Sequence, residues 1–514
     1  MELTSWQQIF LIIASFVIAR RILPSFRYWR SVVRYGCSPV PWYPHWEPVV
    51  GYDLYRKMKA AKEGNRLDSF IAEILSKYGN KKTLMSLIWG LPTLISSDHR
   101  LVQVILTTKM DDFVVAPIRK VANEPFFGQD VFVSDGLAWK MNRKFVQPLL
   151  RKSRFADLSC LEKHGNRLFM QLPADENTQV DLQRLFTFMY VDVATELVSG
   201  CSMNSLVPEG REKAKEFLAT LERVNKGVQR RIMLAPVLKF ASRDCEFEDA
   251  CKQVHQHFED YIDKEISGDT SGQQEGRPTL VRDALCVSQD RSFVRDQLIG
   301  FFLPMHSSSV FTLSDLFFQL ARAPEVWKAL RNEIVAQRGV PLTFELLKSM
   351  TFLQAVIRES IRLLAPADRI IRMCLKDCML PCGGGSSGDD PIYVMKGTLV
   401  DFRSSVLHRN KQFWGQDAEL FRPERWLEGN IRPKWEYVPF GGGARICPAQ
   451  QMILTHYAYI LSRFVLEFET LENRDPCFEF VAEFNLSKRS RNGVQVALRR
   501  DFATCARRGR KTRP

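Results

Sequence analysis

One segment restricts the fold of this chain more than any other: residues 293–321 carry apolar side chains on nearly every side of a helix. A helix of that kind has no polar face for water, so it is buried inside a large protein. Directly after it, Pro324 and Gly339 mark the start and the end of a second helix, following the usual preference for proline at the first turn and glycine past the last. The sequence therefore predicts a large helical domain that contains one long buried helix.

The rest of the chain adds further helices and a few short strands. Thr351 and Gln354 form a capping box, which predicts a helix that ends near Leu363. Strand-like segments lie at residues 84–88, 93–96, 392–394, 399–402 and 494–498. We therefore predict a fold that is mostly α with a minor β region, in one large domain at residues 51–500. This exceeds the ordinary size of a domain, and a cofactor filling its centre would help to explain the excess.

The composition is that of a globular protein, with 45% apolar and 25% charged residues in a chain of 514. A net charge of +14 favours an anionic partner, which would be nucleic acid, an acidic protein or a membrane surface. We find no nucleic-acid-binding motif in the sequence. Part of the positive excess follows the first apolar segment and part lies in the tail, residues 501–514. This distribution favours a membrane surface as the anionic partner, and we expect that the protein does not bind nucleic acid.

The N-terminal segment is mostly apolar from residue 3 to residue 19, most continuously from residue 9, and is followed by Arg20 and Arg21. It is short for a spanning helix, which usually needs about 20 apolar residues. A cleavable signal peptide is the alternative, but no small-residue cleavage site follows the apolar run, and the positive charge lies after that run. We therefore predict a transmembrane signal anchor at residues 1–24, with the body of the protein in the cytoplasm. The prolines that follow predict a stiff linker at residues 25–50.

The 12 cysteines are scattered, without any Cys-x-x-Cys pair. Cys374, Cys378 and Cys382 are the most closely spaced, but no partner ligands for zinc accompany them. A chain of this length does not need disulfides, so we expect a reducing environment. Most of the cysteines are then small buried apolar residues.

Cys447 differs, because it lies in the run FGGGARICPA at residues 440–449. Glycines allow the tight turn that points backbone amides at a thiolate iron ligand, and such hydrogen bonds tune its electron donation. An apolar run then starts a helix, whose N-terminal dipole favours a thiolate over a thiol. The alternatives are a glycine loop that merely turns and a phosphate-binding loop, but the latter needs Lys-Ser/Thr after the glycines. The pattern fits a thiolate ligand to iron, and a glycine loop that merely turns stays open as the alternative.

The same run resembles the haem-binding signature of cytochromes P450, Phe-x-x-Gly-x-Arg-x-Cys-x-Gly, except that Ala449 replaces the final glycine. The resemblance implies haem b, with Cys447 as the axial ligand of the iron. It also implies that Phe440 shields the sulfur, that Gly443 belongs to the turn, and that Arg445 pairs with a haem propionate. Thiolate donation favours cleavage of the O–O bond at haem iron.

Further motifs occur along the chain in the same order as in the family. Glu359 and Arg362 resemble its buried structural pair, with Arg425 as the third partner. Trp139 and Arg143 resemble the Trp-x-x-x-Arg helix that meets a propionate. Arg372 and His408 match two further propionate contacts, although an ordinary core or surface histidine explains His408 equally well. The resemblance covers most of the chain and implies the cytochrome P450 fold.

One stretch departs from the family. The buried helix usually carries Ala/Gly-Gly-x-Asp/Glu-Thr over the haem, where this chain has Pro304, Met305, His306, Ser307 and Ser308. Only the alcohol survives, at Ser308, while Ser307 stands in place of the acid. Proline removes one helical hydrogen bond and kinks the helix, which is another route to an oxygen-binding groove. His306 is a candidate proton donor, unless it points away from the haem.

The resemblance implies a monooxygenase that inserts one oxygen atom from O₂ into a lipophilic small molecule. Electrons would come from NADPH through cytochrome P450 reductase, with cytochrome b5 as a further candidate partner. The chain is similar to the fungal microsomal group that includes alkane and fatty-acid hydroxylases, and many such enzymes modify terpenoids or polyketides in secondary metabolism. The expected location is the endoplasmic reticulum membrane, with a single span and a cytosolic catalytic domain.

Two alternatives stay open. The altered acid–alcohol pair would also suit a haem-thiolate enzyme that catalyses a rearrangement or dehydration without splitting O₂. The second alternative is a non-catalytic haem-binding membrane partner protein, and the cysteine motif argues against it. NADPH consumption that depends on a reductase and is coupled to an oxygenated product would distinguish all three.

Overall fold

The computed structural model describes residues 23–115, 117–173, 175, 177–234, 243–269, 279–365, 368–484 and 487–501. The predicted anchor (1–24) and tail (501–514) therefore lie outside the described residues, apart from residues 23, 24 and 501. Within the described ranges, no helix combines the length and the apolar character that crossing a bilayer requires.

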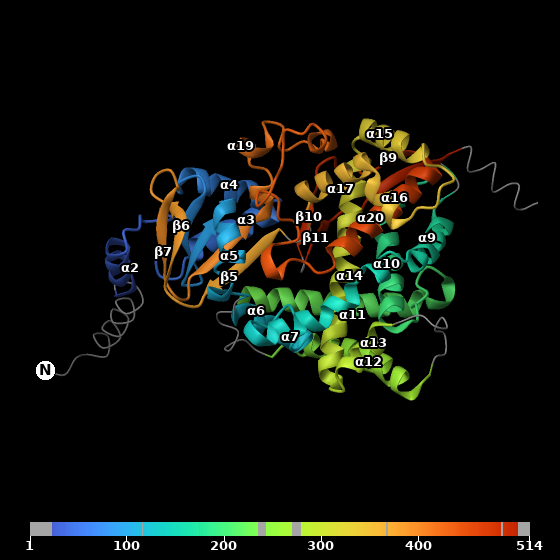
Figure 1. Cartoon of the computed structure of the whole chain (residues 1–514), viewed down its shortest axis with the longest axis horizontal. Helices are drawn as coiled ribbons and strands as arrows, with labels where there is room; N and C mark the ends of the chain where they lie inside the picture. The colour runs from blue at the N-terminus through green and yellow to red at the C-terminus, as the bar shows by residue number, and fades with distance from the viewer. Residues whose placement is uncertain are drawn as a thin grey trace, which may run out of the picture. The chain divides into compact units, whose positions relative to one another are not determined.

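The chain forms two compact units. The first, which we call the sheet unit, comprises Met1–Ala116, Arg369–Asn410 and Pro433–Arg445. The second, the helical unit, comprises Pro117–Asp368, Lys411–Arg432 and Ile446–Pro514. The two together are mostly helical with a minor sheet content, which confirms the predicted fold class (Figure 1).

The sheet unit contains helices α2 (Leu23–Arg34), α3 (Tyr52–Glu63), α4 (Leu67–Lys77), α5 (His99–Leu106) and α18 (Ser404–Leu407). Its strands are β1 (Thr83–Ile88), β2 (Leu91–Ser96), β3 (Phe113–Val114), β5 (Arg369–Cys374), β6 (Cys378–Gly384), β7 (Asp390–Val394) and β8 (Leu399–Arg403). Five strands form one sheet in the order β1-β2-β8-β5-β3, and β6 pairs with β7. Only β2 and β8 run parallel among these pairs. Helix α2 occupies the start of the predicted linker, since Pro24 lies in its first turn, where proline is tolerated.

Both faces of this sheet are covered. Consecutive residues of a strand point to opposite faces. On β2, Leu94 belongs to a core cluster with α5, whereas the next residue, Ile95, belongs to a cluster with α3 and α4. Strands buried on both sides read as continuous apolar runs, which is why their positions could be predicted from composition.

The helical unit contains α6 (Pro117–Phe127), α7 (Gly136–Val146), α8 (Lys152–Phe155), α9 (Ser159–Gln171), α10 (Leu182–Ser199), α11 (Pro208–Leu234), α12 (Cys245–Ser267), α13 (Leu280–Val287), α14 (Arg291–Leu320), α15 (Pro324–Val335), α16 (Phe344–Ser349), α17 (Thr351–Leu363), α19 (Lys411–Trp414) and α20 (Gln450–Glu467). Its strands form two small sheets, β4 (Val180–Asp181) with β12 (Gln495–Arg500) and β9 (Phe468–Asn473), and β10 (Ala482–Phe484) with β11 (Lys488–Ser490).

Helix α14 is the long buried helix that the sequence predicts. It packs against α6, α10, α12, α13, α17 and α20 (Figure 1). The side chain of Asp290 begins it by accepting hydrogen bonds from the backbone N–H groups of Ser292 and Phe293. The helix continues through Pro304, so the contacts around it compensate for the hydrogen bond that proline cannot make.

Helix α17 has the predicted bounds, but the predicted capping box is wrong. Thr351 is the first helical residue, and Gln354 donates to the carbonyl of Leu347. The backbone N–H groups of Phe352 and Leu353, which have no acceptor within the helix, donate instead to the carboxylate of Glu333 on α15, at 2.9 and 2.8 Å. A carboxylate from a neighbouring helix satisfies the helix start and favours its dipole.

Candidate functional site

The glycine loop that precedes Cys447 belongs to the sheet unit, and close packing explains its composition. Gly441 and Gly443 have φ of 72° and 63°, in the left-handed region. A Cβ on Gly443 would lie 1.8 Å from the carbonyl oxygen of Leu106 at the end of α5. A Cβ on Gly442 would lie 2.4 Å from the Trp435 ring. The glycines therefore allow both the turn and the close approach of α5, the second of which the sequence did not reveal.

His408 supports the same loop from inside the sheet unit. Its side chain is fully buried, and its Nε2 accepts a hydrogen bond of 2.9 Å from the backbone N–H of Val438. Its ring also lies 5.3 Å from that of Tyr437. The bond fixes the backbone two residues before Phe440, so His408 is a positioning residue of the loop. Its contact with a propionate stays a prediction.

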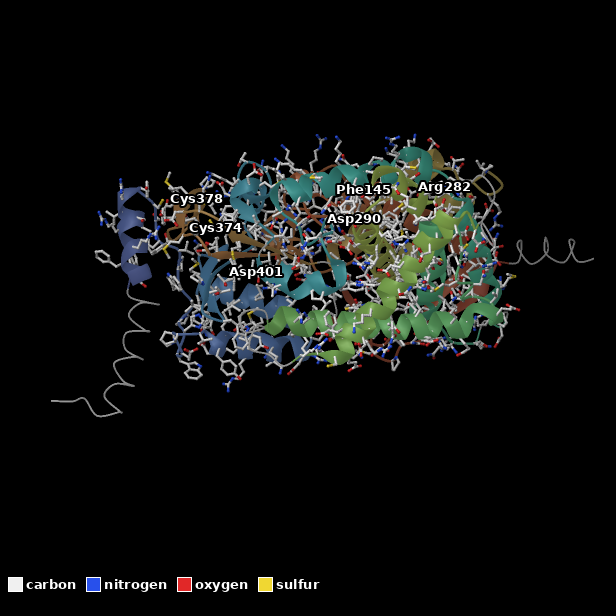
Figure 2. The ribbon with its side chains drawn as sticks, turned by 90° about the horizontal axis from the view of Figure 1, so that it is seen from below. Phe145, Arg282, Asp290, Cys374, Cys378 and Asp401 are labelled. Atoms are coloured by element: carbon white, nitrogen blue, oxygen red, sulfur yellow. The ribbon has the colours of Figure 1, made fainter. Side chains whose placement is uncertain are left out.

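The predicted cations of the sheet unit lie in its strands and in the loop. Arg372 is a buried residue of β5 and donates to the carbonyl of Ile371. Arg445 is partly buried and ends the short helical turn Gly443–Arg445. The carboxylate of Asp401, labelled in Figure 2, accepts two hydrogen bonds from Arg369, at 2.9 and 2.7 Å. That pair ties β8 to β5, the strand that carries Arg372.

Two other cysteines of the sheet unit lie side by side. The sulfurs of Cys374 and Cys378 are 3.8 Å apart (Figure 2). Cys382 is buried further along β6 and lies near the Asp98 carboxylate. None of the three belongs to a group of ligands for a metal among the described residues.

Cys447 lies in the helical unit, three residues before α20 begins at Gln450. Burial raises the pKa of its thiol, while a backbone hydrogen bond from Ala449 and the positive charge of Arg143 lower it. Arg143 lies on α7, one turn after the buried Trp139. A single sulfur beside a backbone donor and a guanidinium fits a thiolate ligand. Ala449 has φ −89°, which any residue can adopt, so its replacement of glycine does not strain the backbone.

The departure from the family lies on α14. Between residues 301 and 320, only Phe301, Pro304, Ser308 and Phe311 are partly exposed, and all others are buried. Their spacing of three and four residues places them on one face of the helix. Ser307 is buried outside this face, and its Oγ donates to the carbonyl of Leu303 at 2.7 Å.

His306 also lies off this face. Its ring stacks on that of Phe302, with centroids 5.9 Å apart, and it interacts with the backbone of Thr187 on α10. Burial lowers the pKa of the imidazole to about 4, so it is neutral at physiological pH. His306 therefore points toward α10 and does not share a face with Ser308.

Glu359, Arg362 and Arg425 meet in a closed network in the helical unit. All three are buried, and the Glu359 carboxylate accepts from Arg362 Nε and Nη2 and from Arg425 Nε, each at 2.8 Å. The backbone N–H of Arg422 and the indole N–H of Trp426 also donate to it. This network joins α17 to the segment Pro423–Trp426.

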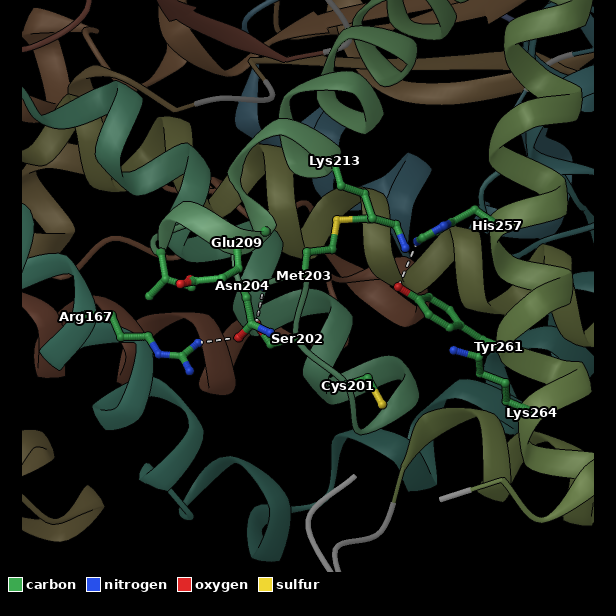
Figure 3. Close-up of a pocket in the computed structure, with 12 residues that line it drawn as sticks. Arg167, Cys201, Ser202, Met203, Asn204, Glu209, Lys213, His257, Tyr261 and Lys264 are labelled. Atoms are coloured by element: carbon green, nitrogen blue, oxygen red, sulfur yellow. Dashed lines mark hydrogen bonds between the residues drawn. The ribbon is translucent and has the colours of Figure 1, made fainter. Parts of the chain in front are cut away.

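A separate pocket of about 500 Å³ opens elsewhere in the helical unit (Figure 3). Its lining comes from α9, α11, α12 and the segment after α10, and includes three cations, Arg167, Lys213 and Lys264. None of the predicted site residues lines it.

Comparison with known proteins agrees with the motifs. The family model described as Cytochrome P450 matches residues 41–493. Among curated relatives, cytochrome P450 monooxygenase apdE of Emericella nidulans is 32% identical over 90% of this chain and 89% of its own length. Cytochrome P450 monooxygenase iccC of Talaromyces variabilis is also 32% identical, over 90% of this chain and 92% of its own. Cytochrome P450 monooxygenase tenA of Beauveria bassiana is 28% identical, over 94% and 96%.

Proposed function

Because the chain belongs to the cytochrome P450 family, whose members hold haem through a cysteine thiolate, we propose that it is a monooxygenase with Cys447 as the iron ligand. When bound, the haem supplies O₂ activation, with one oxygen atom entering a lipophilic substrate and the other leaving as water. Electrons come from NADPH through cytochrome P450 reductase, with cytochrome b5 as a further partner. Because the relatives are fungal, we place the substrate in fungal secondary metabolism, as a terpenoid or polyketide, with fatty-acid or alkane hydroxylation as the alternative.

The observation that carries this proposal is the surroundings of the Cys447 sulfur. The Ala449 amide and the Arg143 charge both favour the thiolate, against the effect of burial. From the family motifs, we assign the haem propionates to the cationic and hydrogen-bonding residues Trp139, Arg143, Arg372, His408 and Arg445. Phe440 keeps water from the sulfur, and the turn at Gly443 holds the loop in place.

Carbon monoxide difference spectra of the reduced protein test the ligand. A thiolate ligand gives the strongly red-shifted band that characterises the family. Cys447→Ser should abolish this band, whereas Cys201→Ser, at another partly buried cysteine of the helical unit, should keep it. If Cys447→Ser kept the band, the assignment of the iron ligand would be wrong.

We assign the proton relay for oxygen activation to Ser308 Oγ, since Ser308 lies on the partly exposed face of α14. Positioned proton transfer contributes about 10²–10⁴-fold. Ser308→Ala should therefore lower product yield and divert NADPH electrons to peroxide, while substrate binding stays nearly intact. Ser307→Ala is the matched control, because the Ser307 hydroxyl is held by the carbonyl of Leu303.

The alternative is the enzyme that rearranges or dehydrates its substrate without splitting O₂, and the missing acid in residues 304–308 favours it. If Ser308→Ala changed neither product yield nor peroxide release, the role of its hydroxyl would be refuted. Product that forms without NADPH or O₂ would then establish the alternative.

We also propose that residues 1–24 anchor the protein in the endoplasmic reticulum membrane, before a linker at 25–50 and a cytosolic catalytic domain at 51–500. Helix α2 supports a membrane contact: Phe26, Trp29 and Val33 are exposed on it at spacings of three and four, whereas Tyr28 and Val32 pack against Tyr393. Such an apolar face beside arginines is typical of a helix at a membrane surface.

Alkaline carbonate extraction of microsomes tests the anchor. The full chain should stay in the pellet, and deletion of residues 1–22 should release it. The truncated protein should still bind anionic liposomes through α2 and should lose that binding on Trp29→Ser. Release of the intact chain by carbonate would contradict the anchor.

A further inference from the structure

Helices α9 and α10 carry four buried side chains that the proposed haem chemistry does not use. Cys160 and His164 lie four residues apart on α9, and Asp192 and Glu196 lie four apart on α10. A spacing of four places each pair on one side of its helix. The two helices pack against each other, and the four residues are between 0% and 3% exposed.

The donor atoms of three of them converge. One ligand atom each of Cys160, His164 and Glu196 lie within 4.8 Å of one another. His164 Nε2 and Glu196 Oε2 are 2.8 Å apart. The ammonium of Lys163 also donates to Glu196 Oε2, at 2.7 Å, and so holds the carboxylate in place.

The fourth side chain lies behind the imidazole. Asp192 Oδ2 is 3.8 Å from His164 Nδ1, and this buried nitrogen has no hydrogen-bond partner among the described residues. The backbone N–H of Ser205 donates to Asp192 Oδ1 at 2.8 Å and holds the carboxylate in place. A histidine that ligates a metal usually donates its second ring N–H to a carboxylate, and Asp192 offers a carboxylate on that side of the ring.

We propose that Cys160, His164 and Glu196 form a zinc site that joins α9 to α10, with Asp192 orienting His164. Sulfur, imidazole nitrogen and carboxylate oxygen are the donors that Zn²⁺ prefers, and water completes the tetrahedron. The charges balance, because the cysteine thiolate and the two carboxylates offset Zn²⁺ and the ammonium of Lys163, which lies 2.7 Å from Glu196. Binding transfers the thiol proton to solvent.

The competing arrangement is a metal-free cluster, in which Lys163 and His164 contact the Glu196 carboxylate directly, at 2.7 and 2.8 Å, and no ion is bound. The two differ in the role of Cys160. A zinc site requires its thiolate, whereas the metal-free cluster makes no use of sulfur.

Zinc content of the full-length haem-loaded protein separates the two. The protein, free of any histidine tag, is loaded with Zn²⁺, dialysed against metal-free buffer, and analysed by mass spectrometry for zinc and for haem iron. We expect one equivalent of zinc per haem in the wild type and below about one-tenth in Cys160→Ser. The matched control is Cys251→Ser, since Cys251 is a buried cysteine of α12 with the same 3% exposure, and it should keep the full equivalent.

X-ray absorption at the zinc edge gives a second readout. It should show one sulfur neighbour in the wild type, and zinc should raise the thermal midpoint of the wild type but not of Cys160→Ser. Absence of zinc from the wild type, or equal zinc in Cys160→Ser, would overturn the proposal in favour of the metal-free cluster. The haem spectrum should be intact in every variant, so this result is independent of the assignment of Cys447.

Discussion

Replacing Glu359 by glutamine should be among the most destabilising isosteric changes in the helical unit. The carboxylate accepts five hydrogen bonds and faces two buried guanidinium groups, those of Arg362 and Arg425. Glutamine has the same shape, but it turns one acceptor oxygen into a donor. Even with the better orientation, the two donors at Oε2, Arg362 Nε and Trp426 Nε1, lose their acceptor.

The magnitude follows from the lost charge. Removing one partner of a buried ion pair costs about 3–5 kcal/mol, because the remaining charge is left uncompensated. That corresponds to a folded-to-unfolded ratio that is lower by roughly 100- to 5,000-fold. The haem-loaded fraction of expressed protein and the urea midpoint of tryptophan fluorescence both measure this loss.

Glu333→Gln is the matched control. Glu333 also accepts hydrogen bonds at α17, two from backbone N–H groups and one from the Thr351 hydroxyl, so its loss leaves no buried cation unpaired. Glu333→Gln should lower the free energy of unfolding by about 1 kcal/mol. Equal urea midpoints for the two variants would refute the argument from buried charge.

Two further predictions concern the loop and the pH dependence of stability. Gly443→Ala should largely abolish haem incorporation, because the new Cβ would collide with the Leu106 carbonyl oxygen. Gly441→Ala is the control and should keep most of the haem, because no atom lies within 4 Å of the Cβ position there. Equal haem content in the two variants would contradict this argument. Burial raises the pKa of Asp130 from 3.8 in the unfolded chain to about 8 in the folded protein. The protonated carboxyl therefore contributes its full stabilisation below the unfolded pKa, and this stabilisation is lost as the pH rises through the folded pKa. Asp130→Asn should therefore reduce the loss of urea midpoint between about pH 5 and pH 8, where each pH unit costs the wild type up to about 1.4 kcal/mol.

Local patterns were enough to predict much of the fold. The bounds of α14 and α17 lie within two residues of prediction, and β1, β2, β7, β8 and β12 overlap the predicted strand segments, with ends that differ by at most two residues. Strands β5 and β6 were missed, since polar and small residues interrupt their apolar pattern. The capping box failed because Glu333, a residue distant in sequence, supplies the acceptor that Thr351 was expected to provide.

The candidate site likewise combines features that local sequence predicts with features that depend on tertiary packing. The Cys447 run could be read locally, because turn, thiolate and helix start all lie within a few residues. The burial of His408 and the direction of His306 depend on packing, which sequence spacing cannot supply. The sequence sets Cys160 apart from the other scattered cysteines in no way, since Asp192 and Glu196 come near it only when α9 packs against α10. The spacings Cys-x-x-x-His and Asp-x-x-x-Glu were the sequence features that could have indicated a metal site.

The parallel pairing of β2 with β8 has a consequence for synthesis of the chain on the ribosome. Thr93–Ser96 pairs with Leu399–Phe402, about 300 residues later. At about 5–20 residues per second, the β1–β2 hairpin waits roughly 15–60 s for its partner. Throughout that time its free edge can pair with other nascent chains. Nascent chains stalled before β8 emerges should therefore be cleaved by protease in this hairpin, and chains stalled after the whole sheet unit has emerged should be protected. Slower translation should lower the yield of folded enzyme unless chaperones cover the edge.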